Sequence, residues 1–453
     1  MSVSSTTAPQ LKDLVPEVPL WPEKEFTLSG STFGEVYQMA VWLSTAFSAP
    51  DSSQEVFCLA TEDKAVIAAA LLARLCGGPA LLLPHALSGR ALAGMQEATG
   101  FTTVISDTGR EIPPGTRILC PKVGSKSEVI MSCAPDKELL RLFTGGSTGS
   151  PKVWSKTTGN LFAEARYLAD RFAITDQDLI VATISPCHIY GLLFSVLIPL
   201  VSSATVTAKT PSFPAEIGEA VQVNKATILA AVPAHYRALR QQVTSKGSLR
   251  FAVSSAGMLT PGDNTIFCDR NKTPIIEVYG STETGGIATR NRSAGETNFT
   301  PFSTVDWKIN RERLLVHSPY ISLQTTRDED GFFITGDRVE AGPGNSFILK
   351  GRMDGITKVA GKRVDLKEIR EAIRQQPGVE DCFVLTLPDT SGRENRISAL
   401  VQATVLDKEN LISKLQTVVE PYALPRIIRR INTIPMTGSG KYDLPAIRRI
   451  LAK

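Results

Sequence analysis

Residues Leu142 to Lys156 read LFTGGSTGSPKVWSK and form the most informative stretch of this chain. A short apolar run enters a loop of Gly, Ser and Thr residues, and Pro151 and Lys152 follow it. Glycines let a backbone approach an anion closely and turn its N–H groups toward it, and a lysine adds positive charge. The stretch therefore predicts a phosphate-binding loop, with a flexible surface loop as the alternative.

This loop does not match the two commonest nucleotide motifs. A P-loop needs Gly-Lys followed by Ser or Thr at a helix start. The two Gly-Lys pairs of the chain begin at Gly361 and Gly440, and Arg363 and Tyr442 follow them. No G-x-G-x-x-G fingerprint follows a predicted strand, which argues against a Rossmann dinucleotide fold. Any nucleotide chemistry belongs to another class.

Composition places the chain among ordinary globular proteins. Its 453 residues predict roughly two to four domains. The first thirty residues show no secretory signal, and the longest apolar stretches fall short of the ~20 residues that a membrane span needs. The seven cysteines are scattered without metal-site or redox-motif spacing. We therefore expect reduced thiols, a cytoplasmic protein without a membrane span, and no zinc site.

The basic surplus is confined to the C-terminal part of the chain. Residues 353–453 hold 17 Lys and Arg against 12 Asp and Glu, whereas the rest of the chain holds 32 against 33. A solvated helix face is one explanation, and attraction of an anionic partner is the other. Few aromatic residues are interleaved with the basic ones, so we expect no nucleic-acid partner.

Helical and strand-like patterns alternate from Thr32 to Lys209 and again from Phe213 to Thr289, and short β segments follow from Thr304 to Leu349. The pattern predicts a helix over Lys64–Leu75. The predicted strands are Ala80–Leu83, Thr103–Ser106, Thr227–Val232, Phe251–Ser255, Ile275–Tyr279, Trp307–Ile309, Arg313–His317, Phe332–Thr335 and Phe347–Leu349.

The last hundred residues predict a separate small domain. Asp365 is expected to start a helix that Gly378 ends, strands are expected over Cys382–Leu387 and Ile397–Thr404, and a last helix over Leu444–Leu451. The predicted fold class is α/β. Residues 1–350 would form a large N-terminal domain of layered α/β subdomains plus a β-rich subdomain. Residues 354–453 would form a small mobile C-terminal α+β domain, with a hinge near residues 352–355.

Four further segments carry side chains that suit nucleotide chemistry. The first, Glu277–Gly285, reads EVYGSTETG and overlaps the end of a predicted strand. Glu283 suits Mg²⁺, which prefers one or two carboxylates together with phosphate oxygens. Tyr279 could stack on a purine. The alternative is a purely structural turn.

The other three segments lie toward the C-terminus. Thr335-Gly-Asp337 is expected to end a β segment and to offer a carboxylate to ribose hydroxyls. The run KGRMDGITKVAGKR spans Lys350–Arg363, where Arg352 is a ribose or phosphate ligand candidate and Asp354 a hinge candidate, or the run is a charged linker. The loop PMTGSGK ends in Lys441, which could reach a phosphate or could simply be solvated.

Together these segments resemble the adenylate-forming superfamily of acyl-CoA synthetases, luciferases and nonribosomal-peptide adenylation domains. The phosphate loop, YGSTETG, TGD, GRMD…KVAGKRV and TGSGK occur in the family's order from about Leu139 to Ala446. Two positions depart from the family pattern. Gly145 stands where the family usually has Ser or Thr, and Val153 stands where it usually has Gly.

The resemblance implies a role for each matching residue. The ATP phosphates would be held by Thr144, Gly146, Ser147, Thr148, Gly149 and Lys152, with Thr282 at the α-phosphate. Glu283 would bind Mg²⁺. The adenine would be walled by Ser255, Ala256, Gly257, Tyr279 and Gly280, and the ribose bound by Asp337 and Arg352. Asp354 would be the hinge, Lys441 the catalytic lysine of adenylation, and Gly361 part of the thiol passage.

The resemblance further implies an ATP-dependent carboxylic acid:thiol ligase with coenzyme A as co-substrate. The acyl pocket would draw on Pro186–Gly191, Val232–Tyr236 and Gly280–Gly286. His188 matches a position where acyl- and aryl-CoA ligases often carry His, whereas a core histidine is expected at His235. No acidic residue lies between Pro186 and Leu200, which favours an uncharged acyl tail over an amino acid.

Two other functions remain open. One is an acyl- or aryl-AMP ligase that loads the phosphopantetheine arm of an acyl carrier protein, because that arm offers the same thiol as coenzyme A. The other is a degenerate nucleotide-binding homologue without catalysis. The joint presence of Glu283, Asp337, Arg352 and Lys441 argues against the degenerate homologue.

Overall fold

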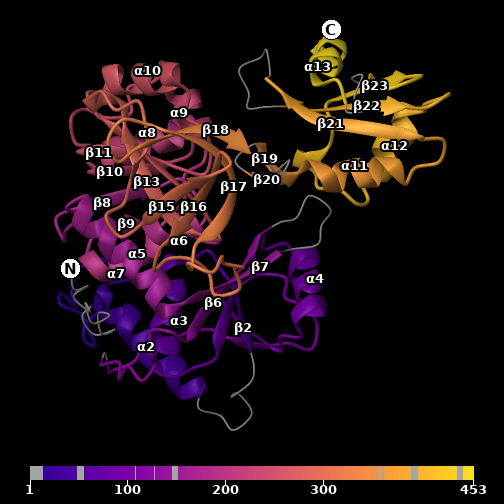
Figure 1. The fold of residues 1–453 in the computed structure, drawn as a ribbon. Coiled ribbons are helices and arrows are strands. Elements are labelled where there is room, and N and C mark those ends of the chain that lie inside the picture. Colours follow the sequence, from indigo (N-terminus) through magenta and orange to yellow (C-terminus); the bar gives the residue numbers. More distant parts are fainter. Residues whose placement is uncertain are drawn as a thin grey trace.

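The computed structural model describes residues 14–47, 56–107, 109–126, 128–144, 152–352, 356–359, 362–388, 396–435 and 442–452. Its largest body is built from two mostly parallel sheets, and the C-terminal elements from α11 to α13 form a separate smaller body (Figure 1). The α/β character predicted from the sequence is therefore confirmed.

The first sheet has the strand order β5-β4-β2-β3-β6-β7, in which only the edge strand β7 is antiparallel. Its strands are β2 (Val56–Ala60), β3 (Ala80–Leu83), β4 (Thr103–Ser106), β5 (Arg117–Leu119), β6 (Glu138–Thr144) and β7 (Lys152–Thr157). Its helices are α2 (Phe33–Phe47), α3 (Lys64–Leu75) and α4 (Gly89–Thr99). Asp63 caps α3 by accepting from the N–H groups of Ala65 and Val66, which fixes the helix start.

The second sheet has the order β1-β9-β8-β10-β11-β12-β13-β14 and turns antiparallel at β13. Its strands are β1 (Thr27–Leu28), β8 (Leu179–Ala182), β9 (Thr205–Thr207), β10 (Ile228–Ala231), β11 (Phe251–Ser254), β12 (Ile275–Ser281), β13 (Gly285–Asn291) and β14 (Thr300–Pro301). The helical elements of this part are α5 (Thr158–Arg171), α6 (Ile189–Leu192), the π-helix η1 (Leu193–Leu197), α7 (Ile198–Ser202), α8 (Pro214–Val223), α9 (Pro233–Ala238), α10 (Pro261–Asn271) and the short 3₁₀ turns η2 (Leu239–Gln241) and η3 (Arg292–Ala294).

Alternation along each strand divides the core into layers. In β8, Ile180 packs into the main core shared by both sheets with α3 and α5, whereas its neighbour Val181 packs against α8 and α10 on the opposite face. In β2, Phe57 faces the shared core and Cys58 faces α4. Because successive side chains of a strand point to opposite faces, both sheets are covered by helices on both faces.

The β-rich part is an antiparallel sheet of β15 (Asp306–Asn310), β16 (Arg313–His317), β17 (Phe333–Ala341) and β18 (Phe347–Arg352). One expectation was wrong here. Thr335-Gly-Asp337 does not end a strand, because β17 continues through it to Ala341 and pairs with β18.

The C-terminal elements begin with a hairpin of β19 (Ile356–Val359) and β20 (Lys362–Asp365), so part of the charged run after Lys350 is strand. They continue with α11 (Leu366–Arg374), β21 (Asp381–Leu387), β22 (Arg396–Gln402), α12 (Lys408–Leu415), the 3₁₀ turn η4 (Pro421–Ala423), β23 (Ile427–Ile431) and α13 (Leu444–Ala452). Asp365 caps α11 as predicted. The helix ends at Arg374 rather than at Gly378, because Gln375 closes its last turn and Gly378 adopts a φ of 79° in the turn that follows.

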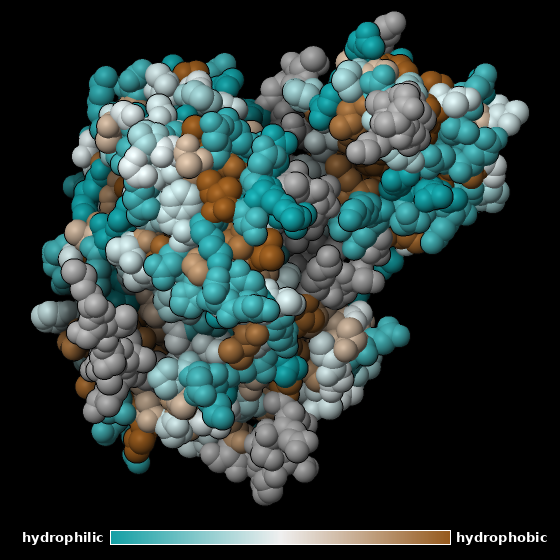
Figure 2. Space-filling model, viewed as in Figure 1, coloured by the Kyte–Doolittle hydropathy of each residue, from teal (hydrophilic) through white to brown (hydrophobic). Residues whose placement is uncertain are grey.

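Two apolar clusters hold this smaller body together, and neither shares a residue with the clusters of the large body. One packs α11 and α12 on one face of the β21–β23 sheet, and the other packs α13 on the opposite face. Hydrophilic residues cover much of the visible face of the smaller body (Figure 2). Among the described residues, no helix combines the length and apolar character needed to cross a bilayer.

Candidate functional site

The carboxyl ends of β8, β10, β11 and β12 meet at one edge of the second sheet, because these four strands are parallel neighbours. The segments that leave this edge carry His188, His235, Ala256 and Glu283 in the order of the strands. Ligands of open α/β sheets bind at this edge. The topology thus brings together four of the segments that the sequence analysis selected.

The Glu283 turn joins β12 to β13. Thr282 is half-buried, and Glu283 is 6 % exposed. The hydroxyls of Ser281 and Thr284 are bonded to each other across the turn at 3.0 Å, which braces the turn. The backbone oxygen of Glu283 accepts from the N–H of Ser322 at 2.8 Å. The backbone of the turn is therefore held by its own bonds and by a neighbouring segment.

The donor chemistry of this turn fits Mg²⁺. Glu283 supplies one carboxylate and Thr282 a hydroxyl, and Mg²⁺ takes one or two protein carboxylates and completes its shell with water and phosphate oxygens. Within the described ranges, no group of three or more His, Cys, Asp and Glu residues could hold a metal by itself. A metal at Glu283 would accordingly need a phosphate substrate beside it.

Tyr279 links β12 to the β-rich sheet. Its hydroxyl donates to Oδ2 of Asp337 at 2.6 Å, and its ring packs against Phe299 and Phe347 with centroids 5.5 and 5.7 Å away. The register of β17 and β18 sets Asp337 opposite Arg352. Three residues expected to contact adenosine therefore lie together, although they are far apart in the sequence.

The adenine-wall candidates follow β11 directly. Ser255, Ala256 and Gly257 are half-buried, and Ala256 has a φ of 66°. This left-handed backbone is uncommon for a residue with a side chain and marks a constrained turn. Gly280 lies in β12 opposite Gly286 of β13, at the base of the Glu283 turn.

The predicted phosphate loop joins β6 to β7. These strands form an antiparallel pair in which Thr144 stands opposite Lys152. Gly146, Ser147, Thr148 and Gly149 lie outside the described residues, as do the side chains of Thr144, Lys152 and Arg352. The hinge candidate Asp354, the passage candidate Gly361 and the lysine candidate Lys441 also lie outside them.

His188 is the N-cap of α6, and its side chain is exposed. Although the residue is exposed, protein packed around the ring still desolvates the imidazole in part and lowers its pKa. Lys362 and the neighbouring His85 lower it further, whereas Glu62 opposes them. The imidazole is thereby biased toward the neutral form. His235 differs, since it is half-buried and bonded to the hydroxyl of Thr183 at 2.7 Å, which suits a core histidine.

Three residues that lie beside these candidates were not among the predicted site residues. His85 follows β3, and burial lowers its pKa. The charge of Glu420 opposes this shift, and that of Lys362 adds to it. Lys362 follows the thiol-passage candidate Gly361. Lys156 of β7 donates to the backbone oxygen of Glu283 at 3.3 Å. Lys156 and Lys362 lie within two of the stretches quoted from the sequence, but no motif gives any of the three a role, and the tertiary structure brings them to the site.

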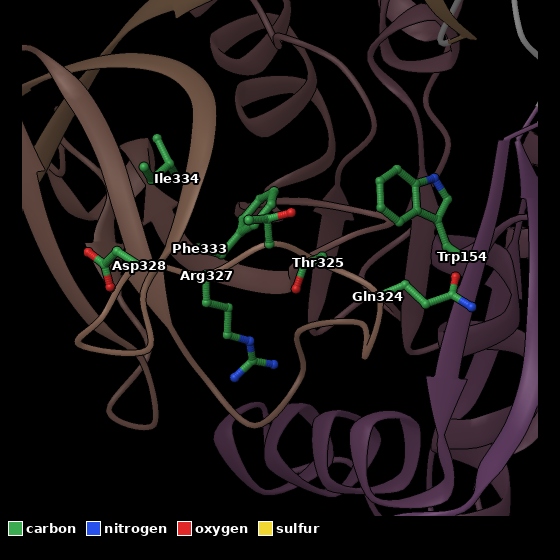
Figure 3. A pocket seen from close by; sticks show the side chains of 8 residues that line it. Trp154, Gln324, Thr325, Arg327, Asp328, Phe333 and Ile334 are labelled. Carbon is green, nitrogen blue, oxygen red and sulfur yellow. The ribbon is translucent and has the colours of Figure 1, made fainter.

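A hollow of about 390 Å³ opens beside β7. Its lining consists of Trp154, Gln324, Thr325, Thr326, Arg327, Asp328, Phe333 and Ile334. Figure 3 shows Trp154 and Gln324 at one end of this hollow and Asp328 and Ile334 at the other, with Arg327 directed away from Phe333. None of the predicted site residues lines the hollow, although Trp154 follows the phosphate loop and β17 leads to Asp337.

Two family profiles match the chain. The profile of the AMP-binding enzyme family matches residues 55–316, and that of the AMP-binding enzyme C-terminal domain matches residues 368–441. Acetyl-coenzyme A synthetase 1 of Kluyveromyces lactis is 26% identical over 71% of the chain. Feruloyl-CoA synthase of an Amycolatopsis species is 25% identical over 69% of the chain and 70% of its own length. The chain matches only 54% of the length of that acetyl-coenzyme A synthetase.

Solved structures share the fold over nearly the whole chain. A malonyl-CoA ligase with methylmalonyl-CoA and AMP bound superposes with a TM-score of 0.77 and 20% identity, covering 93% of this chain and 99% of its own. An o-succinylbenzoate CoA synthetase from Bacillus subtilis superposes with a TM-score of 0.76 and 17% identity, covering 97% of each chain. The similarity therefore includes the large body and the small C-terminal one.

Proposed function

Because the chain belongs to the AMP-binding enzyme family, we propose that it is an ATP-dependent carboxylic acid:thiol ligase. It forms an acyl-adenylate with release of pyrophosphate and then transfers the acyl group to coenzyme A. The acyl group is aromatic or a medium to long fatty chain. Residues 1–350 form the adenylation domain and residues 354–453 the mobile domain, with the hinge at Asp354.

The bond between Tyr279 and Asp337 is the observation that carries this proposal. Tyr279 lies in β12, the strand that leads to Glu283. Asp337 lies in β17, where it stands opposite Arg352 of β18. An adenine nucleotide needs an aromatic face for the base, a carboxylate for the ribose hydroxyls and nearby donors for its phosphates. The proposed adenosine site thus combines side chains from two sheets around one hydrogen bond.

The chemistry follows from the charges that develop. A carboxylate oxygen of the acid forms a bond to the α-phosphorus of ATP, and the bond from that phosphorus to the pyrophosphate oxygen breaks. Bound Mg²⁺ would neutralise phosphate charge, and Glu283 and Thr282 are the residues that would hold it. In this proposal Lys441 contacts both the carboxylate and the α-phosphate, and Lys152 and the phosphate loop hold the leaving pyrophosphate.

The acyl pocket is proposed at the segments that follow β8 and β10. Tyr190 there is buried, and its hydroxyl donates to the backbone oxygens of Val253 at 2.8 Å and Ala231 at 3.2 Å, so it ties the His188 segment to the sheet edge. Glu62 lies beside this segment, but it already accepts from the Ser185 hydroxyl at 2.7 Å. This arrangement supports an uncharged acyl tail rather than an amino acid.

Thiol transfer follows adenylation. The thiol attacks the carbonyl carbon of the mixed anhydride, and AMP leaves with the electron pair of the broken C–O bond. Because its lowered pKa favours the neutral imidazole, His188 adds no fixed positive charge to this segment. The relatives named above act on coenzyme A, which supports it as the acceptor, and the carrier-protein arm is the alternative.

The deciding experiment measures pyrophosphate release from ATP across a panel of aromatic and fatty carboxylic acids, with and without Mg²⁺. We expect release only when both an acid and Mg²⁺ are present. Thioester formation is then measured with coenzyme A and, separately, with a holo acyl carrier protein. Turnover only with the carrier protein would select the alternative, and no turnover with any acid would select the degenerate homologue.

Lys441→Ala tests the catalytic lysine. Loss of one preorganised electrostatic contact to the transition state typically slows a reaction by about 10²–10³-fold. We expect adenylation to fall at least this far, while ATP binding measured by calorimetry stays nearly unchanged. Lys414→Ala, at an exposed position of α12, serves as the control and should adenylate normally. A normal adenylation rate in Lys441→Ala would remove Lys441 from the mechanism.

A further inference from the structure

Two ionisable side chains are completely enclosed beside the Glu283 turn, and the mechanism above uses neither. Lys156 of β7 is 0 % exposed and Glu164 of α5 is 2 % exposed. Burying a charge pair is a weak way to stabilise a fold, because the cost of desolvation offsets much of the attraction. Their presence at this point therefore needs an explanation other than stability.

Both side chains bind the backbone that surrounds Glu283. The ammonium of Lys156 donates to the backbone oxygens of Tyr320 at 2.7 Å and of Glu283 at 3.3 Å. The carboxylate of Glu164 accepts from the N–H of Gly286 at 2.7 Å. One side chain thus contacts the middle of the turn, and the other contacts the strand that leaves it.

The fit around Glu164 is close. Gly285 has a φ of 67°, and a Cβ at this position would lie 2.7 Å from Oε2 of Glu164 and 2.6 Å from the Cβ of Tyr320. A residue with a side chain would therefore meet both the carboxylate and the tyrosine. The absence of a side chain at Gly285 lets the turn rest directly on Glu164.

The electrostatics tie the two residues to each other. Burial lowers the pKa of Lys156, and the nearby charge of Glu164 opposes this shift. Burial raises the pKa of Glu164, whereas Lys156 and the N–H of Gly286 lower it. Each group thus helps the other to keep its charge, so both positions act as one unit.

We propose that Lys156 and Glu164 are positioning residues that fix the Thr282–Glu283 turn relative to β7, the strand that leaves the phosphate loop. β7 begins at Lys152, so a single strand connects the proposed pyrophosphate contact to the support of the proposed metal ligand. The pair sets the affinity of the site for Mg²⁺ in the presence of ATP. This inference rests on the proposed function, because it assigns Mg²⁺ and ATP to this turn.

The test uses the double variant Lys156→Met/Glu164→Gln. It removes both charges together and avoids leaving one of them unpaired, and the introduced side-chain amide keeps an acceptor for the N–H of Gly286. Lys64→Met is the matched control. Lys64 is 1 % exposed, donates to the backbone oxygens of Thr207 and Lys209 at 2.6 and 3.1 Å, and has a pKa lowered to about 8, but it lies in α3.

Two readouts separate positioning from simple stability. Outer-shell partners of a metal ligand typically change metal affinity about 10–100-fold. We expect the double variant to need that much more Mg²⁺ for half-maximal pyrophosphate release, whereas Lys64→Met keeps the wild-type requirement. Hydrogen–deuterium exchange should quicken across residues 280–287 in the double variant and stay unchanged there in Lys64→Met.

A folded double variant with the wild-type Mg²⁺ requirement and wild-type exchange at residues 280–287 would overturn the inference. If the double variant does not fold, Glu164→Gln alone decides through the same two readouts, with unchanged values again counting against the inference. A wild-type protein that releases no pyrophosphate with any acid would overturn the proposed function instead. In that case the exchange comparison and calorimetric binding of Mg²⁺ with ATP still test the pair.

Discussion

Tyr279 shows how much of the candidate site depends on one side chain. Its ring packs against Phe299 and Phe347, and its hydroxyl donates to the carboxylate of Asp337 at 2.6 Å. A carboxylate with an orienting hydrogen bond loses less freedom when it binds a ribose than one without. Tyr279 therefore serves the nucleotide through its hydroxyl as well as through its ring.

Tyr279→Phe isolates the contribution of the hydroxyl. The ring stays, while a hydrogen bond worth about 1 kcal/mol is lost, so we expect the KM for ATP to rise about three- to tenfold. The kcat should change less than about twofold, because the hydroxyl acts on ground-state and transition-state binding alike. Steady-state kinetics with ATP varied at saturating acid gives both constants.

Tyr37→Phe is the matched control for this substitution. Tyr37 is 1 % exposed and donates its hydroxyl to the backbone oxygen of Pro16 at 2.9 Å, in helix α2. We expect its loss to lower the thermal midpoint without changing the KM for ATP. An equal KM change in both variants would show that the effect of Tyr279→Phe comes from stability.

The hairpin of β12 and β13 is the element that presents Glu283. A Cβ on Gly280 would overlap the backbone oxygen of Gly285 and lie 2.9 Å from the Cα of Gly286, so the two strands can approach only without it. Backbone cannot move aside as a flexible side chain can. The close approach at Gly280 thus holds the turn in its present shape.

Gly280→Ala should separate the strands of this hairpin. We expect a loss of about 1–3 kcal/mol in the free energy of unfolding, as for other overpacked positions, together with slower pyrophosphate release. Gly94→Ala provides the contrast, because a Cβ at Gly94 in α4 would meet nothing within 4 Å. Alanine is favoured in helix interiors, so this variant should gain about 0.5–1 kcal/mol and retain activity. Urea unfolding of both variants checks the opposite signs.

Elements with a strong local signal were predicted closely, and they include the strands Ala80–Leu83, Thr103–Ser106 and Arg313–His317, which have these bounds in the structure. A strand that pairing extends beyond its apolar run was predicted too short. The helix expected over Lys64–Leu75 has these bounds in the structure, because its apolar run starts at the cap residue Asp63. The strand expected over Phe332–Thr335 instead spans Phe333–Ala341. Its second half is polar and half-exposed, and backbone bonds to β18 extend it, which composition does not reveal.

The stability of the whole molecule is expected to depend on pH through two half-buried histidines, His85 and His235. Burial lowers the pKa of both His85 and His235 below the ordinary value of 6.5. His85 also feels Glu420, which opposes this shift, and Lys362, which adds to it. As pH falls through 6.5, the unfolded chain binds protons that the folded chain does not. The free energy of unfolding should therefore decrease below pH 6.5 and receive no contribution from these groups above about pH 7.

Urea unfolding between pH 5.5 and 7.5 measures this dependence. His85→Gln and His235→Gln should each show a smaller loss of stability between pH 6.5 and 5.5 than the wild type. Above pH 7 the slopes of variants and wild type should coincide. Identical slopes below pH 6.5 in the variants and the wild type would show that these two histidines do not carry the effect.

The sequence by itself determined the fold class, the family and the order of the candidate segments. Local runs such as the phosphate loop and YGSTETG need particular residue types at fixed spacing, so they can be read without a structure. The tertiary structure decided which side chains meet. The bond from Tyr279 to Asp337 and the enclosure of Lys156 and Glu164 around the Glu283 turn join separate strands and helices. Such contacts depend on sheet order and strand register, which are set by packing of the whole chain and leave no local pattern.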